Sequence, residues 1–381
     1  IMISENVEDL NEGWCCDTKN LINVMVSENN KCFNFIDDSF LVVKNNDEFL
    51  YFARRNIENV VVPPSIEVID PYAFDGCNQL KSIEFAENTK LQTIGKYSFR
   101  GSSINQLVLP PSVTNISKGS FMDCKLLTTI TLNENLISID DKAFMLSSIT
   151  EIIIPPHIKK IAKSTFENCK NLKTIQFMEN SELTEIGENV FMNSAIEQIN
   201  IPLLVTAIMD FAFSNCENLE NINLTANSEL KVIGENAFEK SAIKYIFIPL
   251  HVTEIQKHAF ENCKKLKCVE FAENSELKII DEYAFYNSSI ESISIGQHIS
   301  KISKDCFSDC LDLKAIEIIE NSELKSIEMN AFSESSIESI MISENVEDLN
   351  EGWCCDTKNL INVIVSENNK YFKFIDDSFL V

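Results

Sequence analysis

The chain has 381 residues, of which 45% are hydrophobic and 24% charged, as is ordinary for a folded globular protein. Its 32 basic and 58 acidic side chains leave a net charge of −26, which repels the phosphates of nucleic acids and of anionic lipid surfaces. No apolar run is long enough to cross a bilayer. We therefore expect neither a nucleic-acid partner nor direct insertion of this chain into a membrane.

The two ends of the chain repeat each other. Residues 1–42 reappear as residues 340–381 with three positions changed, namely Met25/Ile364, Cys32/Tyr371 and Asn34/Lys373. This near-identity indicates duplication of a whole block of repeats, although an artificial overlap of the two ends fits as well. The block interpretation treats the chain as one elongated domain with four parts: the end of a preceding block (1–26), a β-hairpin-type insert (27–62), a continuous solenoid (63–365) and the start of the next insert (366–381).

The insert interrupts an otherwise regular spacing, because Cys15 and Phe74 lie 59 residues apart. Three short apolar runs, 33–36, 40–43 and 49–52, are separated by the turn residues 37–38 and 44–47. This pattern predicts a β-hairpin or a three-stranded excursion.

From residue 74 onward, a phenylalanine recurs every 22 to 25 residues. The column comprises Phe74, Phe99, Phe121, Phe144, Phe166, Phe191, Phe213, Phe238, Phe260, Phe285, Phe307 and Phe332. A fixed period of this size is typical of a solenoid. Each repeat predicts an L-x-x-I-x-F strand, a polar turn, a second short apolar stretch and a single helical or 3₁₀ turn at the phenylalanine. The apolar side chains of a single coil bury too little surface to offset the conformational entropy that is lost when the coil becomes ordered. Stacking on neighbouring coils must therefore supply the remaining stabilisation.

Small residues follow each phenylalanine by three positions and alternate between cysteine and serine. The cysteine column is Cys77, Cys124, Cys169, Cys216, Cys263 and Cys310, and the serine column is Ser102, Ser147, Ser194, Ser241, Ser288 and Ser335. Column cysteines lie two coils apart, about 9–10 Å, which is too far for a disulfide. We expect them to be buried structural thiols. The redox state of Cys15, Cys16, Cys354 and Cys355 stays open.

Alternation along the strands predicts which side chains face outward from the sheet. Tyr245 and Phe247, flanked by Asn223 and Glu270, are the most suggestive of these, and Ile153 is a further candidate contact. Exposed aromatic residues can anchor a partner protein, or can simply pack across neighbouring strands. Three glycosylation sequons begin at Asn115, Asn223 and Asn287, of which we expect Asn287 to be buried.

Few features of the sequence suggest a catalytic, metal or cofactor site. There is no nucleophile motif, no phosphate-binding glycine loop and no paired-cysteine zinc motif, so we expect no catalytic residues, no metal and no cofactor. His157, His251 and His298 recur after strands but lie too far apart to share a metal. Acidic pairs such as Asp37–Asp38 are expected to be solvated turns rather than calcium ligands.

The repeat L-x-x-I-x-I-P-x-x-V-x-x-I-x-x-x-A-F-x-x-C-x-x-L, carried clearly by residues 171–175 and 248–263, resembles the BspA-type (Treponema pallidum-type) leucine-rich repeat. The resemblance covers essentially the whole chain. It implies a right-handed leucine-rich repeat solenoid of the α/β horseshoe class, with a parallel β-sheet on the concave face and short strands and helical or 3₁₀ turns on the convex side. Low glycine content and abundant Ile, Asn, Glu and Lys resemble a protist, trichomonad-like member.

The resemblance also implies a function. It favours a non-enzymatic protein-binding or adhesion scaffold, at the cell surface or secreted, that contacts a host protein or a neighbouring cell through the concave sheet or the insert. An intracellular scaffold is the alternative location. The competing hypothesis is structural: duplicated blocks associate end to end into a long rod or filament, because repeated, heterologous contacts do not close.

Overall fold

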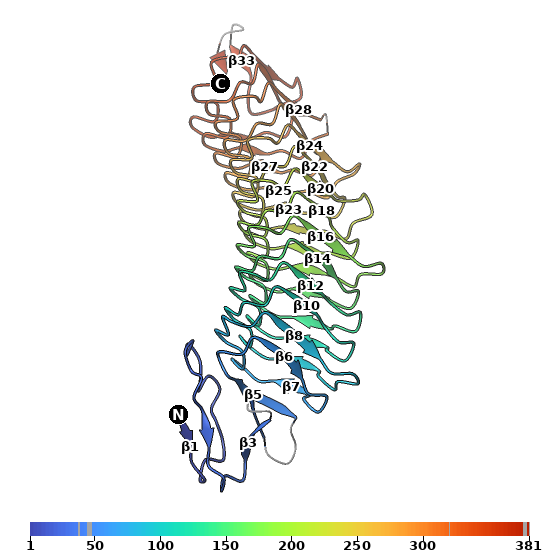
Figure 1. The fold of residues 1–381 in the computed structure, drawn as a ribbon. Coiled ribbons are helices and arrows are strands. Elements are labelled where there is room, and N and C mark those ends of the chain that lie inside the picture. Colours follow the sequence, from blue (N-terminus) through green and yellow to red (C-terminus); the bar gives the residue numbers. More distant parts are fainter. Residues whose placement is uncertain (37–38, 44–47, 320, 376–378, 381) are drawn as a thin grey trace. The chain divides into compact units, whose positions relative to one another are not determined.

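The computed structural model describes residues 1–36, 39–43, 48–319, 321–375 and 379–380 (Figure 1). The predicted turns 37–38 and 44–47 lie outside the described residues. The chain forms two compact units, residues 1–183 with 193–195, and residues 184–192 with 196–381. Each unit is a stack of coils, and each is described by itself below.

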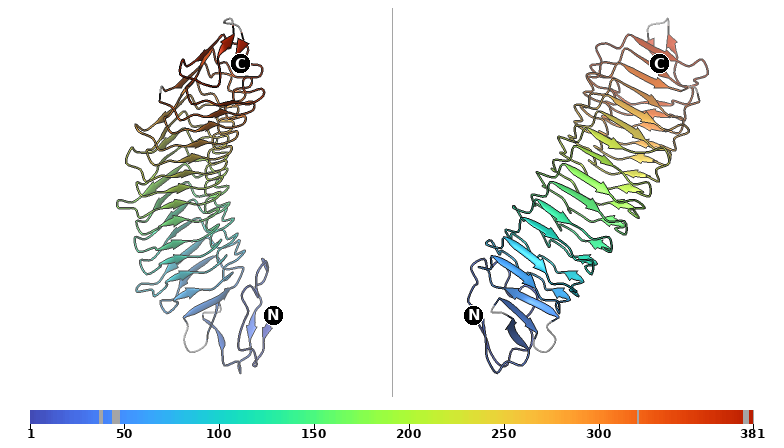
Figure 2. Two further views of the ribbon diagram at one scale, coloured as in Figure 1. Left: turned by 180° about the vertical axis from the view of Figure 1, so that it is seen from behind. Right: turned by 45° about the vertical axis from the view of Figure 1, so that its right-hand side comes forward.

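The longer strands of each unit run parallel, one per coil, and lie side by side (Figure 2). Neighbours pair in register one coil apart, as Glu151 with Thr174 and Tyr245 with Cys268. In the first unit these strands are β6 (Asn59–Val62), β8 (Ser82–Phe85), β10 (Gln106–Val108), β12 (Thr129–Thr131), β14 (Glu151–Ile154) and β16 (Thr174–Phe177). In the second unit they are β18 (Gln198–Asn200), β20 (Asn221–Asn223), β22 (Tyr245–Ile248), β24 (Cys268–Phe271), β26 (Ser292–Ile295), β28 (Ala315–Ile318), β30 (Ser339–Ile342) and β32 (Asn362–Val365).

A second parallel ladder is built from two-residue strands whose second residue is buried in nearly every coil. In the first unit these are β7 (Val68–Ile69), β9 (Thr93–Ile94), β11 (Asn115–Ile116), β13 (Ser138–Ile139) and β15 (Lys160–Ile161). In the second unit they are β17 (Glu185–Ile186), β19 (Ala207–Ile208), β21 (Val232–Ile233), β23 (Glu254–Ile255), β25 (Ile279–Ile280), β27 (Lys301–Ile302), β29 (Ser326–Ile327) and β31 (Asp348–Leu349). The predicted solenoid of stacked coils with a parallel sheet is confirmed.

A third ladder runs through the phenylalanine turns. The phenylalanine side chains are fully buried and stack, with ring centroids 5.2 Å apart both for Phe213–Phe238 and for Phe238–Phe260. The backbone N–H of each phenylalanine donates to the next coil, as Phe238 does to the carbonyl of Ala259 at 2.8 Å. The N–H groups on either side of the phenylalanine donate within their own coil, as Glu239 does to the Asn236 carbonyl at 3.1 Å, so the polar backbone of each turn is satisfied partly between coils and partly within one.

The prediction of a helical or 3₁₀ turn at each phenylalanine is wrong: the described residues contain no α- or 3₁₀-helix. In each phenylalanine turn, the residues two before and two after the phenylalanine have positive φ, as Asn236 (φ 54°) and Lys240 (φ 54°) do around Phe238. A right-handed helix needs consecutive residues with negative φ, and the two left-handed residues, four positions apart, interrupt such a run. Apolar spacing in the sequence does not report the sign of φ.

The N-terminal part of the first unit carries β1 (Met2–Ile3) and β2 (Met25–Val26), which pair in parallel, and then three antiparallel strands. These are β3 (Phe33–Ile36), β4 (Phe40–Val43) and β5 (Phe49–Ala53), and β5 goes on to pair in parallel with β7. Ile3, Cys15, Val24, Phe33 and Phe52 form one buried cluster there. In the second unit, β33 (Phe374–Ile375) and β34 (Phe379–Leu380) form a corresponding antiparallel pair.

Candidate functional site

The most distinctive surface of the second unit lies on the outward face of β22 and β24. Tyr245 is 43% exposed and Phe247 is half-buried, although alternation predicted that both face solvent. Across the strand pair, Tyr245 lies opposite the exposed Cys268, and Phe247 lies opposite Glu270. We call Tyr245, Phe247, Cys268 and Glu270 the Tyr245 cluster.

A hydrogen bond orders the cluster. The Tyr245 hydroxyl donates to Oε2 of Glu270 at 2.6 Å. Partial burial, followed by this hydrogen bond and the charge of Glu270, raises the pKa of Tyr245 to about 12. The tyrosine is therefore a neutral donor at physiological pH, hydrogen-bonded to a carboxylate of the next strand.

Exposed ion pairs border the cluster at the start of the strands. Lys244 Nζ lies 2.6 Å from Glu220 Oε2, and Lys267 Nζ lies 2.9 Å from Asp312 Oδ2. Pairs this exposed contribute little to stability. A partner that covered the aromatic side chains of the cluster would meet these alternating positive and negative charges beside them.

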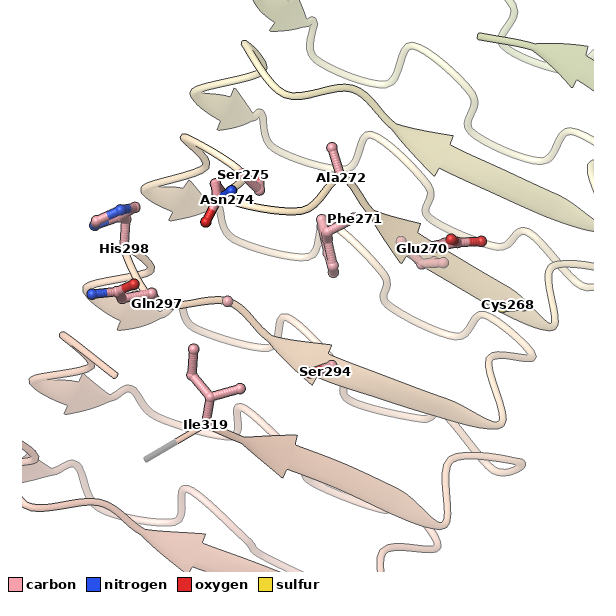
Figure 3. A pocket seen from close by; sticks show the side chains of 12 residues that line it. Cys268, Glu270, Phe271, Ala272, Asn274, Ser275, Ser294, Gln297, His298 and Ile319 are labelled. Atoms are coloured by element: carbon pink, nitrogen blue, oxygen red, sulfur yellow. The ribbon is translucent and has the colours of Figure 1, made fainter. Parts of the chain in front are cut away.

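A groove of about 500 Å³ adjoins the cluster and shares Cys268 and Glu270 with it. Figure 3 shows Glu270 and Ser294 on adjacent strands, Asn274 and Ser275 in one turn, and Gln297 and His298 in the next. His298 Nδ1 lies 3.1 Å from Glu323 Oε1. The groove is thus lined both by the apolar side chains of Phe271 and Ile319 and by several side chains that can form hydrogen bonds.

Gly296 accounts for the groove, and the sequence analysis missed it. Five other short coils have a proline at the corresponding position just after the strand, namely Pro63, Pro110, Pro155, Pro202 and Pro249, and one has Ser343. A Cβ at Gly296 would meet only Ile299 Cδ1, at 4.0 Å, so the position faces open space. The signal was available in the sequence as the one glycine in this proline column.

The five predicted contact residues do not form one site. Tyr245, Phe247 and Glu270 come together, whereas the Asn223 side chain, on β20, donates its amide to Asn200 Oδ1 on β18. Ile153 is 49% exposed and belongs to the first unit, where it lines a separate cavity of about 190 Å³ with Thr131 and Gln176.

The three sequon asparagines differ in how their amides are used. Asn223 is exposed. Asn115 is half-buried, donates to Thr114 Oγ1 at 2.9 Å and accepts from Ser138 at 2.9 Å. Asn287 is half-buried rather than buried, and its Nδ2 donates to Asn262 Oδ1 at 2.6 Å. A glycan on Asn287 would occupy the nitrogen that donates between coils, whereas at Asn115 the hydrogen bond between coils uses Oδ1 rather than the nitrogen that carries a glycan.

All six column cysteines are buried free thiols. Cys263 Sγ donates to the Phe238 carbonyl of the preceding coil at 3.1 Å, and the Ser241 hydroxyl lies 3.5 Å from the same sulfur. The same pair of contacts recurs at Cys124, Cys169 and Cys310. Burial raises the pKa of Cys263 to about 12, so this thiol is unreactive.

Arg55 takes the serine place of this ladder in the coil that bears the insert, and it too was missed. It is 1% exposed, and its guanidinium donates to the carbonyls of Ala73 at 2.7 Å, Tyr72 at 3.1 Å and Cys15 at 3.2 Å. Its Nη1 lies 3.8 Å from Cys77 Sγ. The guanidinium holds the N-terminal coil onto the coil of Phe74.

Three of the four histidines, His157, His251 and His298, each pair with one acidic residue of the next coil. His157 Nδ1 lies 2.9 Å from Glu182 Oε1, and His251 Nδ1 lies 3.4 Å from Glu276 Oε1. Among the described residues, no group of three or more His, Cys, Asp or Glu is placed to hold a metal ion. Asp37–Asp38 lie outside the described residues. Within the described part of the chain, no helix has the length and apolar character to cross a bilayer.

The family model of the BspA type leucine rich repeat region matches residues 48–173, 137–267 and 278–375. A leucine-rich repeat protein from Bacteroides ovatus is similar in structure, with a TM-score of 0.66 and 22% identity over 88% of this chain and 87% of that one. A leucine-rich cell surface protein from Faecalibacterium prausnitzii has a TM-score of 0.54 and 24% identity over 87% of this chain and 94% of that one. No curated protein sequence matches the chain.

Proposed function

Because this chain belongs to the BspA-type leucine-rich repeat family, we propose that it is a non-enzymatic protein-binding or adhesion scaffold, displayed at the cell surface or secreted. The observation that carries the proposal is the Tyr245 cluster, which presents an exposed aromatic residue on a sheet whose backbone is tied down between coils. Tyrosine contributes large contact area at small entropic cost, and is enriched among residues that dominate binding energy.

The groove beside the cluster supports the same proposal. A flat sheet face gives little shape specificity, whereas a groove of about 500 Å³ can receive one protruding side chain or loop of a partner. Glu270 belongs to both features, so a partner that inserts into the groove also covers Tyr245.

The location proposed is consistent with the description of the Faecalibacterium protein as a cell surface protein. Labelling of intact, unpermeabilised cells with an antibody against residues 27–62 tests it. Signal on intact cells supports surface display, and signal only after permeabilisation argues for an internal scaffold.

Alanine substitution tests the contact surface. Tyr245→Ala and Phe247→Ala should each weaken binding of a captured partner by more than about 1 kcal/mol, or roughly fivefold. Val108→Ala, which removes an exposed apolar side chain from β10 of the other unit, is the matched control. Unchanged affinity in both aromatic variants would exclude the Tyr245 cluster and direct attention to the insert.

A second candidate function is structural, with copies of the chain joined end to end into a rod or filament. It is favoured by the near-identity of residues 1–42 and 340–381, which differ at three positions. Sedimentation velocity over a range of concentrations tests it, because open-ended association makes the average mass rise with concentration.

A further inference from the structure

Carboxylates of the second unit differ in whether they have a cationic partner. Those near the starts of the strands are paired with lysines: Glu220 lies 2.6 Å from Lys244, and Asp312 lies 2.9 Å from Lys267. Glu270 faces outward on β24, and no lysine, arginine or histidine of the described residues forms an ion pair with it. Its negative charge is therefore left for a partner to neutralise.

The groove that Glu270 lines holds no cation of this kind either. Among the described residues that line it, none is a lysine or an arginine, and Glu270 is the one acidic side chain. His298 also lines the groove but is already paired with a glutamate of the next coil. Ser294, Asn274 and Gln297 add neutral oxygens that can accept hydrogen bonds (Figure 3). The lining thus offers one carboxylate and several neutral acceptors.

The carboxylate of Glu270 is held in place while half of it stays available. The Tyr245 hydroxyl donates to Oε2 at 2.6 Å, and no hydrogen bond from the described residues reaches Oε1. A side chain that is already ordered loses less conformational entropy when a ligand binds. The exposed ring of Tyr245 lies beside the carboxylate, and an aromatic face attracts a cation.

We propose that the groove receives a lysine or arginine side chain of the partner protein, whose charged end pairs with Glu270 and whose aliphatic stem packs against Phe271. Such side chains bury their stems on apolar surface while the charged end keeps polar contacts. The inference rests on the protein-binding function proposed above and adds the chemistry of the partner, a basic segment.

Charge complementarity favours this occupant over the others. The net charge of −26 attracts basic segments at long range, and Glu270 provides the local contact. An acidic side chain would be repelled by Glu270. An apolar side chain would cover the carboxylate without pairing it, and a buried charge without a partner is costly.

The native thiol of Cys268 makes the preference of the groove measurable without the partner. Cys268 is exposed, lines the groove and lies two residues before Glu270 on β24, so both side chains point to the same face. Its thiolate attacks one sulfur of a small disulfide reagent, which forms a mixed disulfide and releases the other half as a thiol. The fragment left on Cys268 then lies beside Glu270.

Three reagents of similar length carry different charges. Cystamine leaves an ammonium on Cys268, the disulfide of mercaptoethanol leaves a hydroxyl, and the disulfide of thioglycolic acid leaves a carboxylate. Each is equilibrated with the chain in a fixed thiol buffer, and peptide mass spectrometry measures the fraction of Cys268 modified, separately from the exposed Cys16 and Cys355. Comparison between variants of the chain cancels the intrinsic differences between the reagents.

Glu270→Gln should lower the preference of Cys268 for the ammonium over the hydroxyl fragment by at least about fivefold, as expected for loss of one opposite charge about 4 Å away. Glu317→Gln is the matched control. Glu317 is an exposed glutamate on β28 of the same sheet but is not among the residues that line the groove, so its substitution should change the preference by less than about twofold. Equal losses in the two variants, no loss in either, or no modification of Cys268 by any reagent would overturn the inference.

The same variants, tested for affinity toward the captured partner, separate this inference from the proposed function. Glu270→Gln should weaken binding by at least about fivefold, and Glu317→Gln by less than about twofold. Binding that Tyr245→Ala weakens but Glu270→Gln leaves unchanged would overturn the basic side chain and leave the protein-binding function standing. Binding that none of these variants changes would overturn both.

Discussion

At the scale of single residues, the turn at each phenylalanine is the most demanding part of the coil. Two left-handed residues flank the phenylalanine, and many are neither glycine nor asparagine, such as Tyr97, Leu146, Phe211 and Glu334. A left-handed conformation costs an ordinary residue about 1–2 kcal/mol, and less for Asn or Gly. The stacked turns therefore hold strain that the ladder between coils offsets.

Glu334→Asn should raise the free energy of unfolding by about 0.5–1 kcal/mol, since Glu334 is exposed and has φ 56°. Urea unfolding measures the change. Ser333→Asn, one residue earlier and outside the left-handed positions, should change stability by less than about 0.5 kcal/mol. Equal effects of the two substitutions would show that the turns are not strained.

Gly296→Pro tests the groove at the same scale. The five proline counterparts of Gly296 show that its backbone position accepts proline, so the variant should be as stable as the unsubstituted chain or more stable by about 0.5–1 kcal/mol. Its ring should narrow the groove and weaken a partner that enters it. Lower stability would contradict this assignment of the groove to a missing proline.

At the scale of elements, the alternating cysteine and serine ladder ties each coil to the one before it. Cys263→Ala should lower the free energy of unfolding by about 1–2 kcal/mol, because it removes a buried S–H donor and leaves a small void. Cys268→Ala, at an exposed thiol on β24, is the control and should change stability little. In the native chain, a thiol reagent should label Cys268 and spare Cys263. Rapid labelling of both would refute the buried ladder.

Asp70, which directly follows β7, makes the stability of the folded chain depend on pH. Burial, followed by the negative charges of the nearby Glu12 and Asp9, raises the pKa of Asp70 from 3.8 to about 6. Because folding raises the pKa of this acid, the folded chain holds the proton more tightly than the unfolded chain. Stability contributed by Asp70 is therefore present below about pH 4 and is lost as the pH rises through about 6.

Asp70→Asn should consequently stabilise the chain at pH 7 by about 1 kcal/mol, with the gain vanishing near pH 4. Thermal unfolding from pH 4 to 8 measures it. Glu87→Gln, in an exposed turn, serves as the control. A gain that is the same at both pH values would contradict the role of Asp70.

The period of the phenylalanines was enough to predict the strands and the coil stack, because each coil repeats the same apolar positions. The turns could not be predicted, since a left-handed residue such as Leu146 leaves no mark in hydrophobic spacing. Arg55 and Gly296 each depart from a column, serine in one case and proline in the other. Such departures can be recognised in the sequence once the coils have been aligned on the phenylalanine column.

At the scale of the whole molecule, the two ends and the strand faces have different proposed roles. The end segments carry the surfaces proposed for contact between copies. The Tyr245 cluster and its groove, within the second unit, carry the surface proposed for a different protein. The net charge of −26 adds long-range repulsion between copies, which salt reduces, so association between copies should strengthen with ionic strength.

The central claim, that the Tyr245 cluster contacts a partner protein, is tested most directly by the alkylation rate of a native thiol within it. Cys268 is exposed beside Tyr245, and the exposed Cys16 and Cys355 serve as internal references in the same chain. The rates are measured by peptide mass spectrometry with and without the captured partner. The account predicts that the partner slows alkylation of Cys268 severalfold and leaves Cys16 and Cys355 unchanged; a bound partner that leaves the Cys268 rate unaltered would contradict it.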